Sequence, residues 1–101
     1  MSTLAKKLAD AWIKKDLIDV KTTDFPKSRK ESHSIQEQFH KFLKKKTVGW
    51  KIGMVTKNLQ EGAKVDGPMI GKIIEETVLI NPKKINYRKV PHCILECEFA
   101  L

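Results

Sequence analysis

The feature that most constrains this chain is a change in the spacing of its apolar residues near position 47. Before that point, apolar side chains such as Leu4 and Leu8 recur at the period of an amphipathic helix. After it, Val48, Trp50 and Ile52 alternate with small or charged residues, which is the period of a strand. An order of helices followed by strands predicts an α+β fold.

The first half of the chain is expected to contain two helices. The apolar spacing predicts an amphipathic helix over residues 3–16 and a second helix over residues 30–46, where Ile35 lies on the apolar stripe. We therefore divide a single predicted domain into a helical segment, 1–46, and a strand-rich segment, 47–101. At 101 residues the chain is long enough to bury a core.

The second half is expected to form a mixed β-sheet. Strands are predicted at residues 48–53, 71–80 and 93–101, because these runs are apolar or alternating and contain no internal proline. A short helical turn is expected over 55–62, and Gly and Pro residues indicate a turn over 65–71. The last run is expected to be a buried strand.

Lys51 is a candidate site residue because it stands between Gly49 and Gly53 on the predicted strand. Successive side chains point to opposite faces, so Lys51 lies away from the apolar face. Neighbours without side chains leave room for an anionic ligand to approach the ammonium group. The alternative, left open, is a kink that requires glycine beside an exposed lysine.

Glu96 and Glu98 are candidate metal ligands. On a strand the two carboxylates share one face, while Leu95, Cys97 and Phe99 share the other. Two carboxylates on one buried face need a cationic partner, and oxygen ligands favour Mg²⁺, Mn²⁺ or Ca²⁺ over zinc. The alternative is a surface strand with both glutamates in water.

The two cysteines and the lengths of the apolar runs indicate the cellular compartment in which we expect the protein. Cys93 and Cys97 would have Cα atoms about 13 Å apart on a strand, too far for a disulfide, so free thiols are expected. The sequence shows no signal-peptide pattern and no apolar run of the length that a membrane span needs. We therefore expect a cytoplasmic protein that does not enter a membrane.

The chain is strongly basic, with a net charge of +8 and a pI near 9.6. Residues 1–50 carry twelve basic and six acidic side chains. The densest cluster comprises Lys41, Lys44, Lys45 and Lys46. It lacks interleaved aromatic residues and arginines for base readout, so we interpret it as a solvated helix end favoured by the macrodipole. A small module that binds nucleic acid or another anion is the alternative.

Three motifs follow one another at a characteristic spacing, and Gln60 lies between the first and the second. They are Gly49-Trp50-Lys51-Ile52-Gly53, the turn Asp66-Gly67-Pro68 closing on Gly71, and Glu96-x-Glu98-Phe99-Ala100-Leu101. In this order they resemble the 2-keto-4-pentenoate hydratase family of the fumarylacetoacetate hydrolase superfamily. The resemblance is to the N-terminal portion of that family.

The resemblance implies a fold, a cofactor and an activity. The fold would be the front part of a fumarylacetoacetate hydrolase-like β-roll. Glu96 and Glu98, with a third acidic residue further downstream, would hold Mg²⁺ or Mn²⁺, and Lys51 would hold the substrate carboxylate or an enolate. The activity would be that of a hydro-lyase, or in relatives a decarboxylase, on small unsaturated 2-oxo acids of the 2-hydroxypenta-2,4-dienoate type in aromatic catabolism.

Two departures from the family pattern affect the activity that we expect of this chain. Met69 stands where many members have an acidic residue after the proline, and family chains are more than twice as long. We therefore expect an incomplete domain whose isolated chain catalyses poorly. A non-catalytic remnant that assembles with a second chain, and a homo-oligomer, are the further alternatives.

Overall fold

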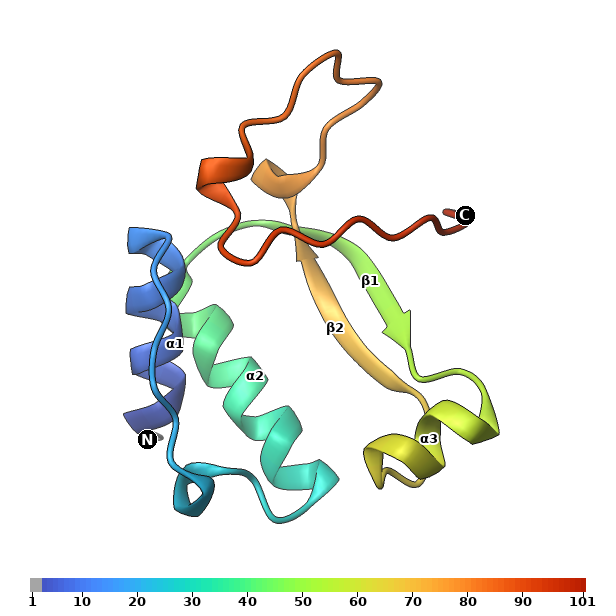
Figure 1. Cartoon of the computed structure of the whole chain (residues 1–101). Coiled ribbons are helices and arrows are strands. Elements are labelled where there is room, and N and C mark those ends of the chain that lie inside the picture. The colour runs from blue at the N-terminus through green and yellow to red at the C-terminus, as the bar shows by residue number, and fades with distance from the viewer. Residues whose placement is uncertain (1–2) are drawn as a thin grey trace. The chain divides into compact units, whose positions relative to one another are not determined.

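The computed structural model describes residues 3–101 and is α+β. Its helices and strands are α1 (Thr3–Lys14), α2 (Arg29–Leu43), β1 (Thr47–Gly53), α3 (Lys57–Ala63) and β2 (Met69–Ile74) (Figure 1). Short 3₁₀ turns lie at Thr22–Asp24, Glu75–Thr77 and Tyr87–Lys89. None of the helices within the described residues is both long and apolar enough to cross a membrane.

The chain divides into two compact units. One is a helical unit, which runs up to Leu43 and also includes Pro82–Leu101. The other is a hairpin unit, Lys44–Asn81, which contains β1, α3 and β2.

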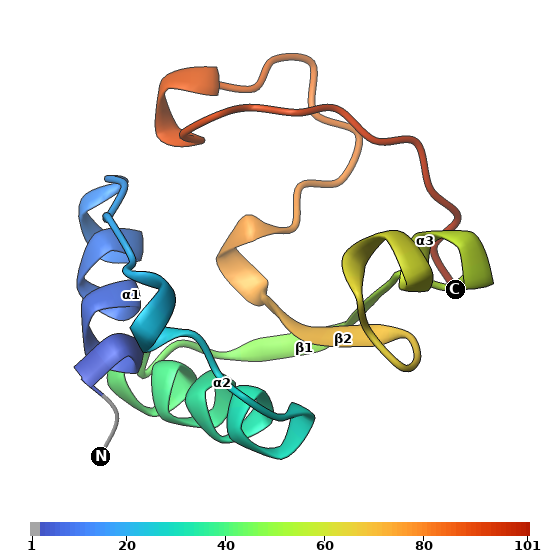
Figure 2. The ribbon, with the colours of Figure 1, turned by 60° about the horizontal axis from the view of Figure 1, so that its bottom comes forward.

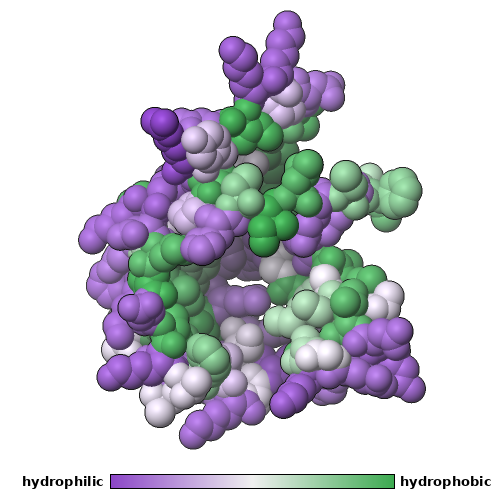
Figure 3. Space-filling view, in the orientation of Figure 1, coloured by the Kyte–Doolittle hydropathy of each residue, from purple (hydrophilic) through white to green (hydrophobic). Residues whose placement is uncertain are grey.

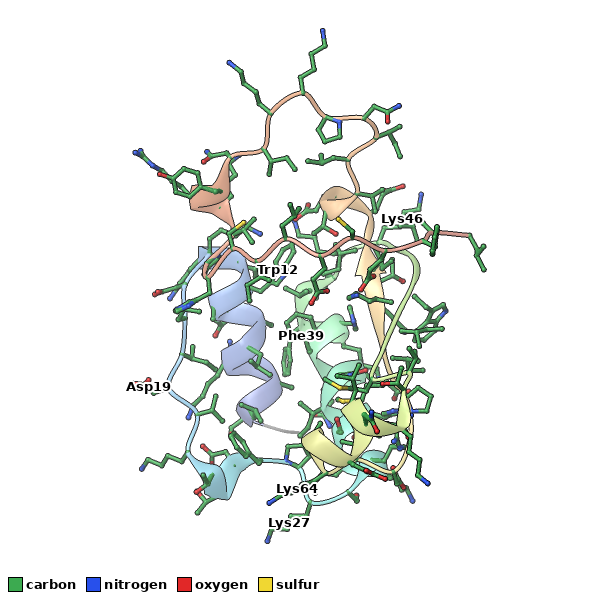
Figure 4. All side chains as sticks on the ribbon, turned by 45° about the vertical axis from the view of Figure 1, so that its right-hand side comes forward. Trp12, Asp19, Lys27, Phe39, Lys46 and Lys64 are labelled. Atoms are coloured by element: carbon green, nitrogen blue, oxygen red, sulfur yellow. The ribbon has the colours of Figure 1, made fainter. Side chains whose placement is uncertain are left out.

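In the helical unit α1 and α2 pack side by side (Figures 1 and 2). The buried apolar residues of the pair are Ala5, Ala9, Ala11 and Leu43. Alanines at helical spacing let the two backbones approach closely. The larger Trp12 and Phe39, both labelled in Figure 4, are only half-buried. Both predicted helices are confirmed, and α1 ends two residues before the predicted end.

The start of α2 is fixed by side chains that accept hydrogen bonds from the backbone. The Oγ atom of Ser28 accepts from the N–H of Glu31 at 3.1 Å, and the Glu31 carboxylate accepts from the N–H of Lys27 at 2.8 Å. The end of α2 differs from the prediction. The helix stops at Leu43 because Lys44 adopts the left-handed conformation, with a φ of 53°.

The hairpin unit is an antiparallel pair of strands joined by α3 (Figure 1). β1 and the short helix lie where the sequence predicts them. The second strand, predicted over 71–80, is β2 at Met69–Ile74, and the chain then turns through Glu75–Thr77. The expected mixed sheet is wrong, because the only sheet in residues 3–101 has two antiparallel strands.

Two ion pairs close the open end of the hairpin. Lys46 Nζ lies 2.8 Å from the Glu75 carboxylate and Lys45 Nζ lies 3.0 Å from that of Glu76. The N–H of Glu75 also donates to the carbonyl of Lys46 at 2.9 Å, which extends the ladder beyond the strands. The interpretation of the lysine cluster as a helix end is therefore wrong for these two lysines, although Lys41 does lie in the last turn of α2.

Residues 93–101 do not form the predicted buried strand. They are extended without regular structure, and their apolar side chains are exposed: Leu95 is 90% and Phe99 is 103% exposed. Figure 3 shows apolar surface at the C-terminal end. The physical reason is that a strand needs a hydrogen-bonded neighbour, and this segment has none in the sheet that the structure describes. Cys93 and Cys97 are free and exposed, as predicted.

Candidate functional site

The register of the hairpin places Lys51 directly opposite Gly71. Because side chains alternate between faces, Lys51 lies on one face of the sheet and Trp50 and Ile52 lie on the other. A third glycine thus joins Gly49 and Gly53 around this lysine.

The surface around Lys51 is open. A Cβ atom at Gly53 or Gly71 would meet no heavy atom within 4 Å, and one at Gly49 would meet only the Cδ1 atom of Ile73, at 3.8 Å. None of the glycines that the structure describes has a positive φ, so the backbone here does not need glycine for its conformation. What these glycines contribute is the absence of side chains at the positions next to Lys51 on this face.

The connection after β1 is fixed by hydrogen bonds. Met54 takes a positive φ of 53°, and its carbonyl accepts a 2.9 Å hydrogen bond from the side-chain amide of Gln60. Thr56 caps α3 by accepting from the N–H of Leu59 at 3.4 Å. These bonds hold the end of β1, and therefore the strand that carries Lys51, against α3.

The opposite face of the hairpin is apolar and carries a second lysine. Lys72 is the cross-strand partner of Trp50, and its Nζ atom lies 5.7 Å from the centre of a Trp50 ring. Trp50 is 58% and Ile52 is 56% exposed. The hairpin therefore presents one lysine on a glycine-lined face and another on an aromatic face.

Glu96 and Glu98 belong to the helical unit and are both exposed. The three predicted site residues are thus divided between the two units, since Lys51 belongs to the hairpin unit. Across residues 3–101 no group of three or more His, Cys, Asp or Glu side chains is placed to hold a metal ion. Two carboxylates have the donor chemistry that suits a hard cation, and by themselves they would supply only part of a ligand set.

Comparison of the chain with protein-family models, with curated proteins and with solved structures gave no match. The family resemblance therefore stays a prediction from the motifs.

Two contributors to the Lys51 face were not assigned a role from the sequence. The sequence places Gly71 at the end of a turn and the start of a strand, and its position opposite Lys51 depends on the cross-strand register. Gln60 acts through a bond to a carbonyl six residues earlier, and no local pattern signals that bond.

Proposed function

We propose that this chain contributes to a divalent-metal-dependent hydro-lyase or decarboxylase that acts on small unsaturated 2-oxo acids. In this proposal the chain is the front part of a fumarylacetoacetate hydrolase-like β-roll. The observation that carries the proposal is the setting of Lys51, a cation on a strand face bordered by three glycines, Gly49, Gly53 and Gly71.

The role of Lys51 follows from charge and space. An ammonium group binds the carboxylate of a 2-oxo acid through charge-assisted hydrogen bonds. It also stabilises the negative charge that develops on an enolate oxygen when a proton leaves the neighbouring carbon. The bordering glycines let a flat, conjugated acid lie close to the backbone of β1.

The role of Glu96 and Glu98 is to supply oxygen ligands. In an extended segment their spacing puts both carboxylates on one side of the chain. Carboxylate oxygens suit Mg²⁺ or Mn²⁺, and these two would hold the ion together with a further acidic ligand. When bound, such an ion supplies Lewis acidity toward the keto oxygen of the substrate.

The first test concerns Lys51. We expect Lys51→Met to weaken binding of oxalate, an analogue of a 2-oxo acid, by about 10-fold or more in the presence of Mn²⁺, because a charge-assisted hydrogen bond is lost. The matched control is Lys72→Met, which removes the lysine on the other face of the same hairpin. Equal affinity of the Lys51 variant and the unmodified chain, measured by calorimetry, would reject this role.

The second test concerns the metal. We expect Glu96→Gln and Glu98→Gln each to abolish Mn²⁺ binding measured by calorimetry, because a neutral amide is a poor replacement for a carboxylate ligand. Glu61→Gln, on α3, is the control and should leave that binding unchanged. Unchanged binding in both site variants would remove the metal from the proposal.

A non-catalytic subunit that needs a second chain is the other candidate. It is favoured by the large apolar side chains that remain exposed in the described part of the chain, among them Trp50, Leu95 and Phe99. Consistent co-purification of one other polypeptide in a fixed ratio would support this candidate, and a homogeneous single-chain species would argue against it.

A further inference from the structure

The hairpin has an edge and a face that its own strands do not cover. A two-stranded sheet leaves the outer edge of β1 without a strand neighbour in residues 3–101. The face that carries Trp50 and Ile52 is about half exposed at both residues. A hairpin of this kind is marginally stable alone, and an uncovered edge with an apolar face is a template for another strand.

The segment 93–101 has the complementary properties. It is extended, exposed and without glycine or proline. If the segment forms a strand, both glutamates fall on one side and the other side carries no charged residue. One side would carry Cys93, Leu95, Cys97, Phe99 and Leu101, and the other would carry both glutamates with Ile94 and Ala100.

The two faces of this segment match the two faces of the hairpin at β1. If the apolar side of the segment continues the Trp50 face, its glutamates fall on the face of Lys51, where opposite charges meet. At the outer edge of β2 the same orientation brings the glutamates beside Met69, Gly71 and Ile73, because Lys72 lies on the Trp50 face. With the apolar side of the segment on the Trp50 face, the charge match is therefore found at β1.

We propose that two copies of this chain exchange these segments, so that residues 93–101 of each copy add as a strand to the outer edge of β1 in the other. In the structure the segment is not in the sheet of its own chain. Reciprocal exchange forms a closed two-fold dimer, because each copy donates one strand and accepts one.

Charge complementarity favours residues 93–101 of a second copy as the strand that adds to β1. The whole chain carries a net charge of +8, so two copies repel each other in general. The segment 93–101 carries two glutamates and no lysine or arginine, so a second, basic copy attracts it. Its acidic side meets Lys51 in the exchanged dimer.

This inference extends the proposed function, and it rests on that function for the roles of Lys51, Glu96 and Glu98. The dimer would bring Lys51 of one copy to the same sheet face as the partner's Glu96 and the partner's Glu98. The metal and substrate site would then be shared between two copies. The tests below measure dimerisation and which side of the segment lies on the Trp50 face. They do not measure metal binding, so a failure of the dimer proposal is distinguishable from a failure of the proposed function.

The first experiment is analytical ultracentrifugation of the unmodified chain and two variants. We expect a dimer that Phe99→Asp weakens by at least about 100-fold, because each dimer loses two buried phenylalanines. The matched control, Ala100→Asp, changes the other side of the segment and should reduce dimerisation much less. Both residues are exposed, so neither change removes a packed core residue. A monomer at all concentrations, or equal effects of the two variants, would overturn the proposal.

The second experiment uses disulfide cross-linking to determine whether the Cys97 side of the segment lies on the Trp50 face of β1. One protein keeps Cys97 alone, with Cys93→Ser. In the other protein both native cysteines are replaced by serine. One new cysteine is placed at position 50 or 52 in the first set, and at position 49, 51 or 53 in the second set. After mixing and oxidation with diamide, we expect cross-linked dimers from at least one position of the first set and from none of the second. Cross-linking from both sets alike, or from neither, would overturn the proposal. So would a cross-link formed only within one chain, tested with Cys97 and the new cysteine in the same protein.

Discussion

Gln60 links the helix α3 to the end of the strand that carries Lys51. Its amide donates a partly buried hydrogen bond of 2.9 Å to the carbonyl of Met54, a residue in the left-handed conformation. Removing the donor leaves that carbonyl without its side-chain partner at a strained position.

We therefore expect Gln60→Ala to destabilise the hairpin unit by about 1 kcal/mol. Glu61→Ala, at an exposed position of the same helix α3, is the control and should change stability by less than about 0.5 kcal/mol. Urea unfolding followed by Trp50 fluorescence in a Trp12→Phe background measures the effect. An unchanged midpoint for Gln60→Ala would show that the bond does not hold the turn.

The setting of Lys51 shows what can and cannot be predicted at the scale of a residue. Its face and its two glycine neighbours follow from alternation along one strand, and the sequence predicts both. The third glycine, Gly71, is twenty positions away along the chain and becomes a neighbour only through the register with β2. Local spacing does not determine register, so this part of the candidate site required the structure.

All three helices end without glycine. The residues that follow α1, α2 and α3 are Lys15, Lys44 and Lys64, and each has a φ between 53° and 56°. This left-handed conformation is costly for a residue with a Cβ atom and is where helices commonly use glycine. It also explains why the sequence predicts an end of α2 beyond Leu43, since no glycine is present there to mark the end.

We expect Lys44→Gly to stabilise the helical unit by about 1 kcal/mol, because glycine adopts the left-handed conformation without steric cost. Lys41→Gly, inside the last turn of α2, should lower stability by about 1 kcal/mol. Urea unfolding followed by Trp12 fluorescence compares the pair in a Trp50→Phe background. Destabilisation by both substitutions would mean that the left-handed residue is not the helix stop.

The beginning of α2 depends on Ser28. We expect Ser28→Ala to destabilise the helical unit by about 1 kcal/mol, because the N–H of Glu31 loses its acceptor. Ser34→Ala, in the middle of α2, serves as the control and should change stability by less than about 0.5 kcal/mol. If both serines gave the same small effect in urea, the cap would contribute nothing measurable.

The elements themselves divide into those that local sequence specifies and those that it does not. The apolar spacing that predicts α1, α2 and β1 lies within each segment, and these elements form where predicted except at the ends of α1 and α2. The segment 93–101 alternates as a strand does, yet alternation does not supply the neighbour that a strand requires. Strand formation there depends on a partner, which is why the sequence overpredicted the sheet.

At the scale of the whole molecule, the buried apolar core is small and divided. Four of its residues, Ala5, Ala9, Ala11 and Leu43, belong to the helical unit, and Ile74 is the buried apolar residue of the hairpin unit within the described chain. Cooperative unfolding of a domain depends on burial that its parts share. Each unit has so little that the two are expected to unfold separately.

The two tryptophans make this testable, because Trp12 lies in the helical unit and Trp50 in the hairpin unit. We expect single-tryptophan variants, Trp50→Phe and Trp12→Phe, to report different urea midpoints at a protein concentration where the chain is monomeric. The hairpin should unfold first, because two strands with one buried apolar residue have little to stabilise them. Raising the concentration until chains associate should move the Trp50 transition upward and leave the Trp12 transition nearly in place, since strand addition covers the β1 edge and the face of Trp50. Coincident transitions at every concentration would instead mean that the units unfold as one cooperative body.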